Sequence, residues 1–222
     1  MGDTHLKSPA MQRVRLWFTL AAIVLVGGAG LWLWWNFDLR WRPHVIGKNQ
    51  AQIVKILDSA GWVSPHLTGP RLYVVAYRDC PECIRFENDA LPKLQAAGVD
   101  TRLIVIARAD RNGLVLSTSP ERTTVAELWL NRDWALLRRW LAVTPPQAWT
   151  APGLVPADGD SARAAVIEVG RKSVEALRPL LKANGVDFAY PTLIWWTKTG
   201  VMHACVCVDP RGFAKVEQEL GA

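Results

Sequence analysis

Four cysteines in two close pairs are the residues of this sequence best suited to do chemistry. Cys80 and Cys83 are separated by two residues, and Cys205 and Cys207 by one. Close pairs of this kind are typical of dithiol–disulfide exchange or of metal binding through thiolates. The four histidines are dispersed and form no cluster with ligand spacing. A zinc site would therefore have to combine the two cysteine pairs.

The Cys80-Pro81-Glu82-Cys83 motif lies between two predicted elements. Residues 72–77 (LYVVAY) predict a buried strand, and from Cys83 onward apolar residues recur at helical intervals. Disulfide exchange needs an exposed thiolate and a second thiol within reach. A helix start stabilises an anion at Cys80, Pro81 suits the first helical position, and Cys83 follows one turn later. This context favours redox chemistry over zinc.

The elements around the motif predict an α/β domain. The helix after the motif should kink at Pro92 and end at Gly98, and residues 99–107 should form a second, parallel strand. Further elements are expected as helices over 50–60, 123–142 and 161–184, an irregular connection over 144–160, a hairpin over 192–208, and a last helix from Pro210 with Asp209 as its N-cap.

The register of the hairpin predicts where the second cysteine pair lies. Its turn at residues 197–200 sets Trp196 opposite Val201, and therefore Cys205 opposite Thr192. Cys205 and Cys207 then share one face of their strand, at the end of the domain that carries the CxxC motif. Two interpretations stay open: small residues packed under a helix, or a second thiol pair that relays electrons or binds a metal ion.

An uncharged segment over residues 16–37 is long enough to cross a bilayer. As a helix its 22 residues span roughly 33 Å, against a hydrocarbon core of about 30 Å. Tryptophans flank it as in an aromatic belt: Trp17 at one end, and Trp32, Trp34, Trp35 and Trp41 at the other. A cleaved signal peptide is the alternative, although signal sequences have shorter apolar regions. The flanking Lys and Arg residues are evenly divided and do not fix the orientation.

The composition argues against nucleic-acid binding. The formal net charge is +6, but the Lys and Arg residues are scattered among Asp and Glu and form no basic stripe. We expect no nucleic-acid partner.

Three segments resemble a known family. Residues 75–83 (VAYRDCPEC) resemble the active-site strand and motif of thioredoxin-fold proteins, with the strongest likeness to bacterial periplasmic disulfide isomerases of the Dsb type. Residues 126–129 (AELW), with Asp133 downstream, are similar to the helical insertion of those proteins. Residues 185–192 (GVDFAYPT) resemble their cis-proline loop. The resemblance covers residues 72–222.

The resemblance implies roles for four residues. Cys80 is the nucleophile, Cys83 the resolving thiol, Pro191 the cis-proline beside them, and Tyr190 a substrate contact. The family usually has a small or β-branched residue where this chain has Tyr190. We expect that residues 38–70 leave no room for the dimerisation domain that precedes the catalytic domain in those isomerases. We therefore expect simple reduction or oxidation of a partner rather than isomerisation.

Charged neighbours predict the redox character of the motif. Asp79 and Glu82 flank Cys80, with Arg78 partly opposing them. Negative neighbours disfavour a thiolate, and a less stabilised thiolate makes the disulfide harder to reduce. We expect a less oxidising motif than that of a dedicated oxidase.

These observations predict an α/β protein with a thioredoxin-like fold, a helical insertion and one preceding transmembrane helix. The expected parts are a cytoplasmic tail (1–15), a transmembrane anchor (16–37), a linker with a short helix (38–70), and the thioredoxin-like domain (71–222, insertion about 120–160). We expect a single-pass protein of a bacterial inner membrane whose catalytic domain faces the periplasm.

The predicted function is thiol–disulfide exchange with protein substrates, without cofactor or metal, and with a membrane redox partner for recycling. A reductase dedicated to one pathway would use the same chemistry. The alternatives are a zinc-binding module that uses all four cysteines, and a non-catalytic docking module with the same fold.

Overall fold

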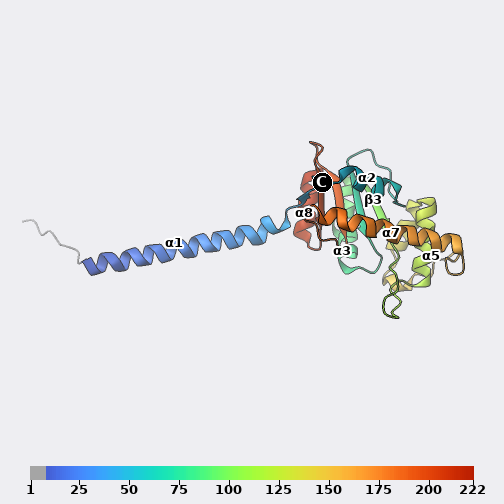
Figure 1. The fold of residues 1–222 in the computed structure, drawn as a ribbon, viewed down its shortest axis with the longest axis horizontal. Helices are drawn as coiled ribbons and strands as arrows, with labels where there is room; N and C mark the ends of the chain where they lie inside the picture. Colours follow the sequence, from blue (N-terminus) through green and yellow to red (C-terminus); the bar gives the residue numbers. More distant parts are fainter. Residues whose placement is uncertain (1–8) are drawn as a thin grey trace, which may run out of the picture. The chain divides into compact units, whose positions relative to one another are not determined.

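The computed structural model describes residues 9–222, with side chains from Leu16 onward (Figure 1). The chain divides after Arg42 into an N-terminal unit and a compact unit over residues 43–222. Of the predicted tail over residues 1–15, residues 1–8 lie outside the described residues. From Pro9 onward the chain is already helical, so the helix begins earlier than the predicted anchor.

The N-terminal unit is a helix long and apolar enough to cross a membrane. Helix α1 (Pro9–Phe37) is followed by the short 3₁₀ helix η1 (Leu39–Trp41). The candidate span covers Leu16–Trp41, with a mean hydropathy of 2.0 in its most apolar window and no buried side chains there. Such a helix suits an anchor, and a signal sequence has the same properties.

The compact unit is built on one five-stranded sheet of order β1-β5-β4-β2-β3. Its strands are β1 (His44–Val45), β2 (Arg71–Ala76), β3 (Asp100–Val105), β4 (Thr192–Trp196) and β5 (Met202–Val206). The pair β2–β3 is parallel, as the sequence predicted, and the other neighbours are antiparallel. The interior strand β2, between β4 and β3, is buried along nearly its whole length, which explains its continuous apolar sequence.

Helices cover both faces of this sheet. Alternate residues of β2 point to opposite faces, with Leu72 and Val74 on one and Tyr73 and Val75 on the other. The first face packs against α3 (Pro81–Asp89), α4 (Leu91–Ala96) and α8 (Pro210–Leu220). The second packs against α2 (Gln50–Ser59) and α7 (Ser161–Lys182). The result is a three-layer α/β/α domain.

A helical insertion connects β3 to α7. It contains α5 (Ser119–Asn131), α6 (Trp134–Leu141) and the 3₁₀ helix η2 (Pro146–Ala148). The predicted continuous helix over 123–142 is therefore wrong: Arg132 is left-handed, at φ 52°, and Asp133 caps a new helix by accepting the Leu136 N–H. This insertion forms part of the right-hand end of the compact unit in Figure 1.

Two further expectations are corrected. Residues 43–70 are not a linker, because β1 pairs with β5 and Ile46, Ile53 and Leu57 are buried in the core. The predicted short helix in that stretch is α2. The hairpin register is shifted by one residue, since the turn pairs Thr197 with Val201 and places Trp196 opposite Met202.

Candidate active site at the Cys-Pro-Glu-Cys motif

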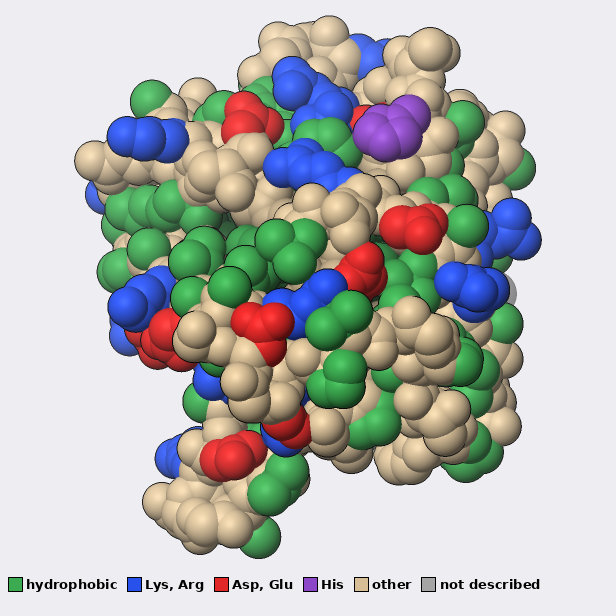
Figure 2. All heavy atoms as spheres, turned by 90° about the vertical axis from the view of Figure 1, so that its right-hand side faces the viewer, with side chains coloured by type: hydrophobic (Ala, Val, Ile, Leu, Met, Phe, Trp, Pro, Cys, Tyr) green, Lys and Arg blue, Asp and Glu red, His purple; other side chains and the backbone are tan. Residues whose placement is uncertain are grey.

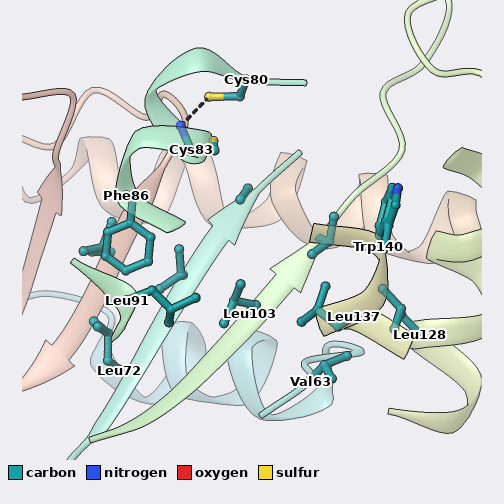
Figure 3. Close-up of a cluster of buried hydrophobic side chains, with 14 of the residues drawn as sticks. Val63, Leu72, Cys80, Cys83, Phe86, Leu91, Leu103, Leu128, Leu137 and Trp140 are labelled. Carbon is teal, nitrogen blue, oxygen red and sulfur yellow. Dashed lines mark hydrogen bonds between the residues drawn. The ribbon is translucent and has the colours of Figure 1, made fainter. Parts of the chain in front are cut away.

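The fold holds the two cysteines of the motif at the start of α3. Cys80 is the N-cap of this helix, Pro81 occupies its first turn, and Cys83 follows in the same turn. The backbone N–H of Cys83 donates to the Cys80 sulfur at 3.2 Å, the contact drawn dashed in Figure 3. The predicted position of the motif, after a strand and at a helix start, is confirmed. In the structure both thiols are free and buried.

The two thiols differ in their readiness to ionise. The pKa of Cys80 is lowered, chiefly by its interaction with the Cys83 thiol and further by the N–H groups at the helix start, although burial opposes this. Burial raises the pKa of Cys83 far above its usual value, and the neighbouring Cys80 adds to the rise. Negative charge therefore belongs on Cys80, while the proton stays on Cys83.

The predicted cis-proline loop lies against Cys80. The Tyr190–Pro191 peptide bond is cis, and the Cys80 thiol donates to the Tyr190 carbonyl oxygen at 3.6 Å. The carbonyl precedes β4, which pairs directly with β2. Sheet pairing therefore brings together residues 110 positions apart in the chain.

Access to Cys80 differs from the expectation. The residue is only 1% exposed, whereas attack on a disulfide needs an exposed thiolate. The Glu82 carboxylate lies 3.7 Å from the sulfur on one side, and the Tyr190 carbonyl lies on another. Glu82 is itself half-buried, so its side chain forms part of the cover.

An aromatic cluster next to Cys80 was not predicted, apart from Tyr190. Tyr190 packs edge-on against Tyr77 and Phe188, with ring centroids 5.0 and 5.1 Å apart. Arg108 lies over the Tyr77 ring at 4.1 Å, and Arg178 over the Phe188 ring at 4.5 Å. Two guanidinium groups thus bracket three rings beside the motif.

The charges around the motif are paired differently from the prediction. Arg78 does not oppose Glu82: it is 4% exposed, lies 3.7 Å from Glu87, and donates to the Leu141 carbonyl at 3.0 Å. Arg108 takes the expected role instead and binds both carboxylate oxygens of Asp79 at 2.8 Å. Asp79 follows β2 and Arg108 follows β3, and these two parallel strands end at the same edge of the sheet. The positions of the two residues after predicted parallel strands were therefore the signal in the sequence for this ion pair.

The second cysteine pair forms a disulfide. Cys205 and Cys207 are bonded to each other and are 7% and 2% exposed. Both belong to the apolar cluster that contains Cys80 and Cys83, so the predicted face is confirmed. With the corrected register Cys205 lies opposite Leu193 rather than Thr192.

The position of this disulfide agrees with packing under a helix. A Cβ on Gly212 of α8 would lie 3.3 Å from the Cys207 sulfur. In the described part of the chain no group of three or more His, Cys, Asp or Glu residues is arranged to hold a metal ion.

The sheet order and connections define a thioredoxin-like α/β domain with a CxxC motif at the start of a helix. Two solved structures resemble the chain over nearly its whole length at 13% identity. BcfH of Salmonella enterica Typhimurium has a TM-score of 0.47, with 96% of this chain and 95% of that chain covered. A linker-deletion mutant of Proteus mirabilis ScsC has a TM-score of 0.40, with 100% of both chains covered. No protein-family model and no curated protein matches the chain.

Proposed function

We propose that this chain is a thiol–disulfide oxidoreductase that acts on protein substrates through Cys80 and Cys83, without a cofactor. The observation that supports this proposal is that the pKa values of the two thiols are shifted in opposite directions. Cys80 sits at a helix N-cap, accepts an N–H at 3.2 Å and has a lowered pKa. Cys83 is buried behind it with a raised pKa. Exchange chemistry needs this division between an attacking and a resolving sulfur.

The reaction proceeds in two balanced steps. The Cys80 thiolate attacks one sulfur of a substrate disulfide, so that a mixed disulfide forms and the other substrate sulfur leaves as a thiolate. Cys83 then gives up its proton and attacks the Cys80 sulfur, which releases the first substrate sulfur. The substrate gains two electrons, and the protein is left with a Cys80–Cys83 disulfide. A membrane redox partner of the dithiol class returns it to the reduced form by the same steps in reverse.

Substrate must uncover Cys80 before the first step. The half-buried Glu82 side chain is the movable part of the cover, because it reaches the sulfur through rotatable bonds. The opposite part is backbone, the Tyr190 carbonyl before Pro191. In the proposal Tyr190 stays in place and contacts the substrate chain, while Pro191 fixes the direction of its carbonyl.

The Glu82 carboxylate moderates the oxidising strength of the motif. The Glu82 carboxylate raises the pKa of Cys80 and opposes the effect of the helix start. Glu82 therefore makes the dithiol a better reductant than it would be without this carboxylate, while the net pKa of Cys80 stays lowered.

The substitution test uses each cysteine as the control for the other. Cys83→Ser removes the resolving sulfur, so mixed disulfides with natural partners should accumulate and appear as adducts on non-reducing gels. Cys80→Ser removes the attacking sulfur and should give none. Absence of adducts in cells with Cys83→Ser, at normal protein levels, would contradict the proposal.

We further propose that α1 anchors the domain in a bacterial inner membrane, with residues 43–222 on the periplasmic side. The support is the apolar span over Leu16–Trp41 together with a dithiol motif, which has partners in an oxidising compartment. A reporter fused after Ala222 should be active only outside the cytoplasm. Reporter activity in the cytoplasm would overturn this topology but would not contradict the proposed thiol–disulfide exchange.

The burial of Cys80 supports a second candidate function, a docking module that does not use its thiols. The double variant Cys80→Ser/Cys83→Ser separates the two candidates. A docking module keeps its cellular function in this variant, whereas an oxidoreductase loses it.

A further inference from the structure

The resolving step of the proposed reaction releases a proton inside the domain. Cys83 must lose its S–H proton before its sulfur can attack Cys80, and burial holds that proton firmly. Cys83 is only 1% exposed, so water has little access to the thiol. The step therefore needs an acceptor within the domain, close to this thiol and able to exist in both protonation states.

Glu87 is an ionisable side chain in the right place. It follows Cys83 by four residues on α3, so both side chains lie on one face of the helix, with Cβ atoms roughly 5–6 Å apart. Long helical side chains lean toward the N-terminus, which extends the Glu87 carboxyl over the turn that holds Cys83. Charged side chains usually lie at the surface, as those in Figure 2 do, whereas the Glu87 side chain is only 9% exposed.

Arg78 holds the Glu87 carboxyl at this end of the helix. Its Nη1 atom lies 3.7 Å from Glu87 Oε2, and the residue belongs to the loop just before the motif. Its Nη2 atom donates to the Leu141 and Val143 carbonyls, at 3.0 and 2.9 Å, at the C-terminal end of α6. These carbonyls stabilise the guanidinium charge, so Arg78 does not require Glu87 to be ionised.

Glu87 can hold or release a proton near neutral pH. Burial raises its pKa to about 7, and the opposing effect of Arg78 is smaller. The charge of Glu87 is in turn one of the causes that raise the pKa of Cys83. Asp79 and Glu121 also act on this set of groups, through Arg78. Protonation of Glu87 thus removes a charge that opposes the Cys83 thiolate.

The attack by Cys80 prepares Cys83 to lose its proton. In the reduced form the Cys80 sulfur raises the pKa of Cys83 through a hydrogen bond and through its charge. Both effects end when the Cys80 sulfur is joined to a substrate sulfur, because it then carries neither a proton nor a charge. The remaining causes of the rise are burial and the charge of Glu87, and transfer of the proton to Glu87 removes the second.

We propose that Glu87 accepts the proton of the Cys83 thiol in the resolving step. The inference rests on the proposed function and adds a proton acceptor to it. The S–H bond of Cys83 breaks as an O–H bond forms on the Glu87 carboxylate. The electron pair left on the Cys83 sulfur forms the bond to the Cys80 sulfur, and the substrate sulfur leaves with the electron pair of the mixed disulfide. The negative charge thereby passes from Glu87 to the departing substrate.

The experiment follows both steps on the full-length reduced protein in detergent. The protein is mixed with excess peptide whose single cysteine is in a mixed disulfide with a small thiol. Acid quenching and mass spectrometry then count the protein–peptide disulfide and the Cys80–Cys83 disulfide over time. In Glu87→Gln we expect the first to form within about twofold of the wild-type rate. Its resolution at pH 7 should be about 100-fold slower, a typical contribution of a general base.

The pH profile separates proton transfer from a structural effect of the substitution. In the wild type the resolution rate should rise as Glu87 ionises, with a midpoint at about pH 7, and then level off. In Glu87→Gln the rate should rise about tenfold per pH unit, because Cys83 then loses its proton to hydroxide, and the two rates should meet at about pH 9. A rate lowered by the same factor at every pH would mean a structural effect and would overturn the proposal.

Asp89→Asn is the matched control, since Asp89 is an exposed carboxylate on the same helix. Both of its rates and their pH profiles should equal those of the wild type. If Glu87→Gln resolves its mixed disulfide as fast as the wild type, Glu87 is not the acceptor, while thiol exchange itself stands. If no mixed disulfide forms even in the wild type, the proposed function fails, and the role of Glu87 fails with it.

Discussion

Glu82→Gln should make Cys80 a stronger acid. The Glu82 carboxylate lies 3.7 Å from the Cys80 sulfur, accepts its S–H in the thiol form and repels it in the thiolate form. Two unit charges at this distance interact by about 1 kcal/mol in a water-like dielectric and by about 4 kcal/mol at an effective dielectric of about 20. Because Glu82 is partly exposed to solvent, we take the lower end of this range.

The expected shift is a fall of roughly one pKa unit at Cys80, which corresponds to about 1.4 kcal/mol. At a pH above this pKa, the same stabilisation of the reduced form makes the Cys80–Cys83 couple more oxidising by about 30 mV. The pH dependence of the alkylation rate measures the first quantity, and equilibration with glutathione measures the second.

Asp89→Asn is the matched control for Glu82→Gln. Asp89 is an exposed carboxylate at the far end of the same helix, so its loss should leave the pKa of Cys80 in place. An unchanged or raised pKa in Glu82→Gln would show that the Cys83 thiol and the helix start set the acidity of Cys80 without Glu82. The proposed electrostatic role of Glu82 would then be wrong.

Three further predictions concern the domain that holds the site. Gly61→Ala should lower the free energy of unfolding by about 1–3 kcal/mol in chemical denaturation, because a Cβ there would lie 2.7 Å from the Trp129 Cα. Glu87→Gln should remove part of the pH dependence of the free energy of unfolding. Burial raises the Glu87 pKa from 4.5 to about 7, so the folded state holds a proton that the unfolded state has lost. Wild-type stability should therefore fall by roughly 3 kcal/mol relative to the variant as pH rises from 4.5 to 7. Alkylation and mass spectrometry of the unreduced protein should leave Cys205 and Cys207 unmodified, because they are bonded to each other.

Each of these predictions has its own contrary result. Gly47→Ala is the control for Gly61→Ala, since a Cβ on Gly47 meets nothing within 4 Å; equal losses in both would refute the steric argument. If the free energies of unfolding of the wild type and of Glu87→Gln differ by the same amount at pH 4.5 and pH 7, the pKa of Glu87 is not raised by folding. Reduction of Cys205–Cys207 in step with Cys80–Cys83 during a glutathione titration would favour the electron relay over simple packing.

Local sequence was sufficient for the elements whose signals are strong and contiguous. The apolar run of β2 and the helical spacing after Cys83 predicted the strand before the motif and the helix after it. The kink predicted at Pro92 corresponds to the break between α3 and α4, just before this proline. The break at Arg132 was missed, although the N-cap residue Asp133 was its signal. An apolar periodicity that continues through a left-handed residue cannot reveal the change of direction.

The site was less predictable because it depends on contacts between distant segments. Cys80 is covered partly by the Tyr190 carbonyl, 110 positions away, and no local pattern encodes that burial. Arg108 reaches Asp79 across 29 positions, through the shared edge of two parallel strands. Glu121 has the sequence pattern of a helix cap, and only the packing of the insertion buries its side chain.

The other charged side chains near the motif are paired with one another. Glu82 is therefore the position at which a substitution can change the acidity of Cys80 without destabilising the fold. Arg78 is buried and lies 3.7 Å from Glu87, so its replacement leaves the Glu87 carboxyl without this partner inside the domain. Asp79 is held by Arg108, which also braces the Tyr77 ring and the loop after β3 through the Leu116 carbonyl. Glu82 acts on the Cys80 sulfur but supports no other element among the described contacts. Substitution there should tune the redox potential, whereas substitution at Arg78 should act first on stability.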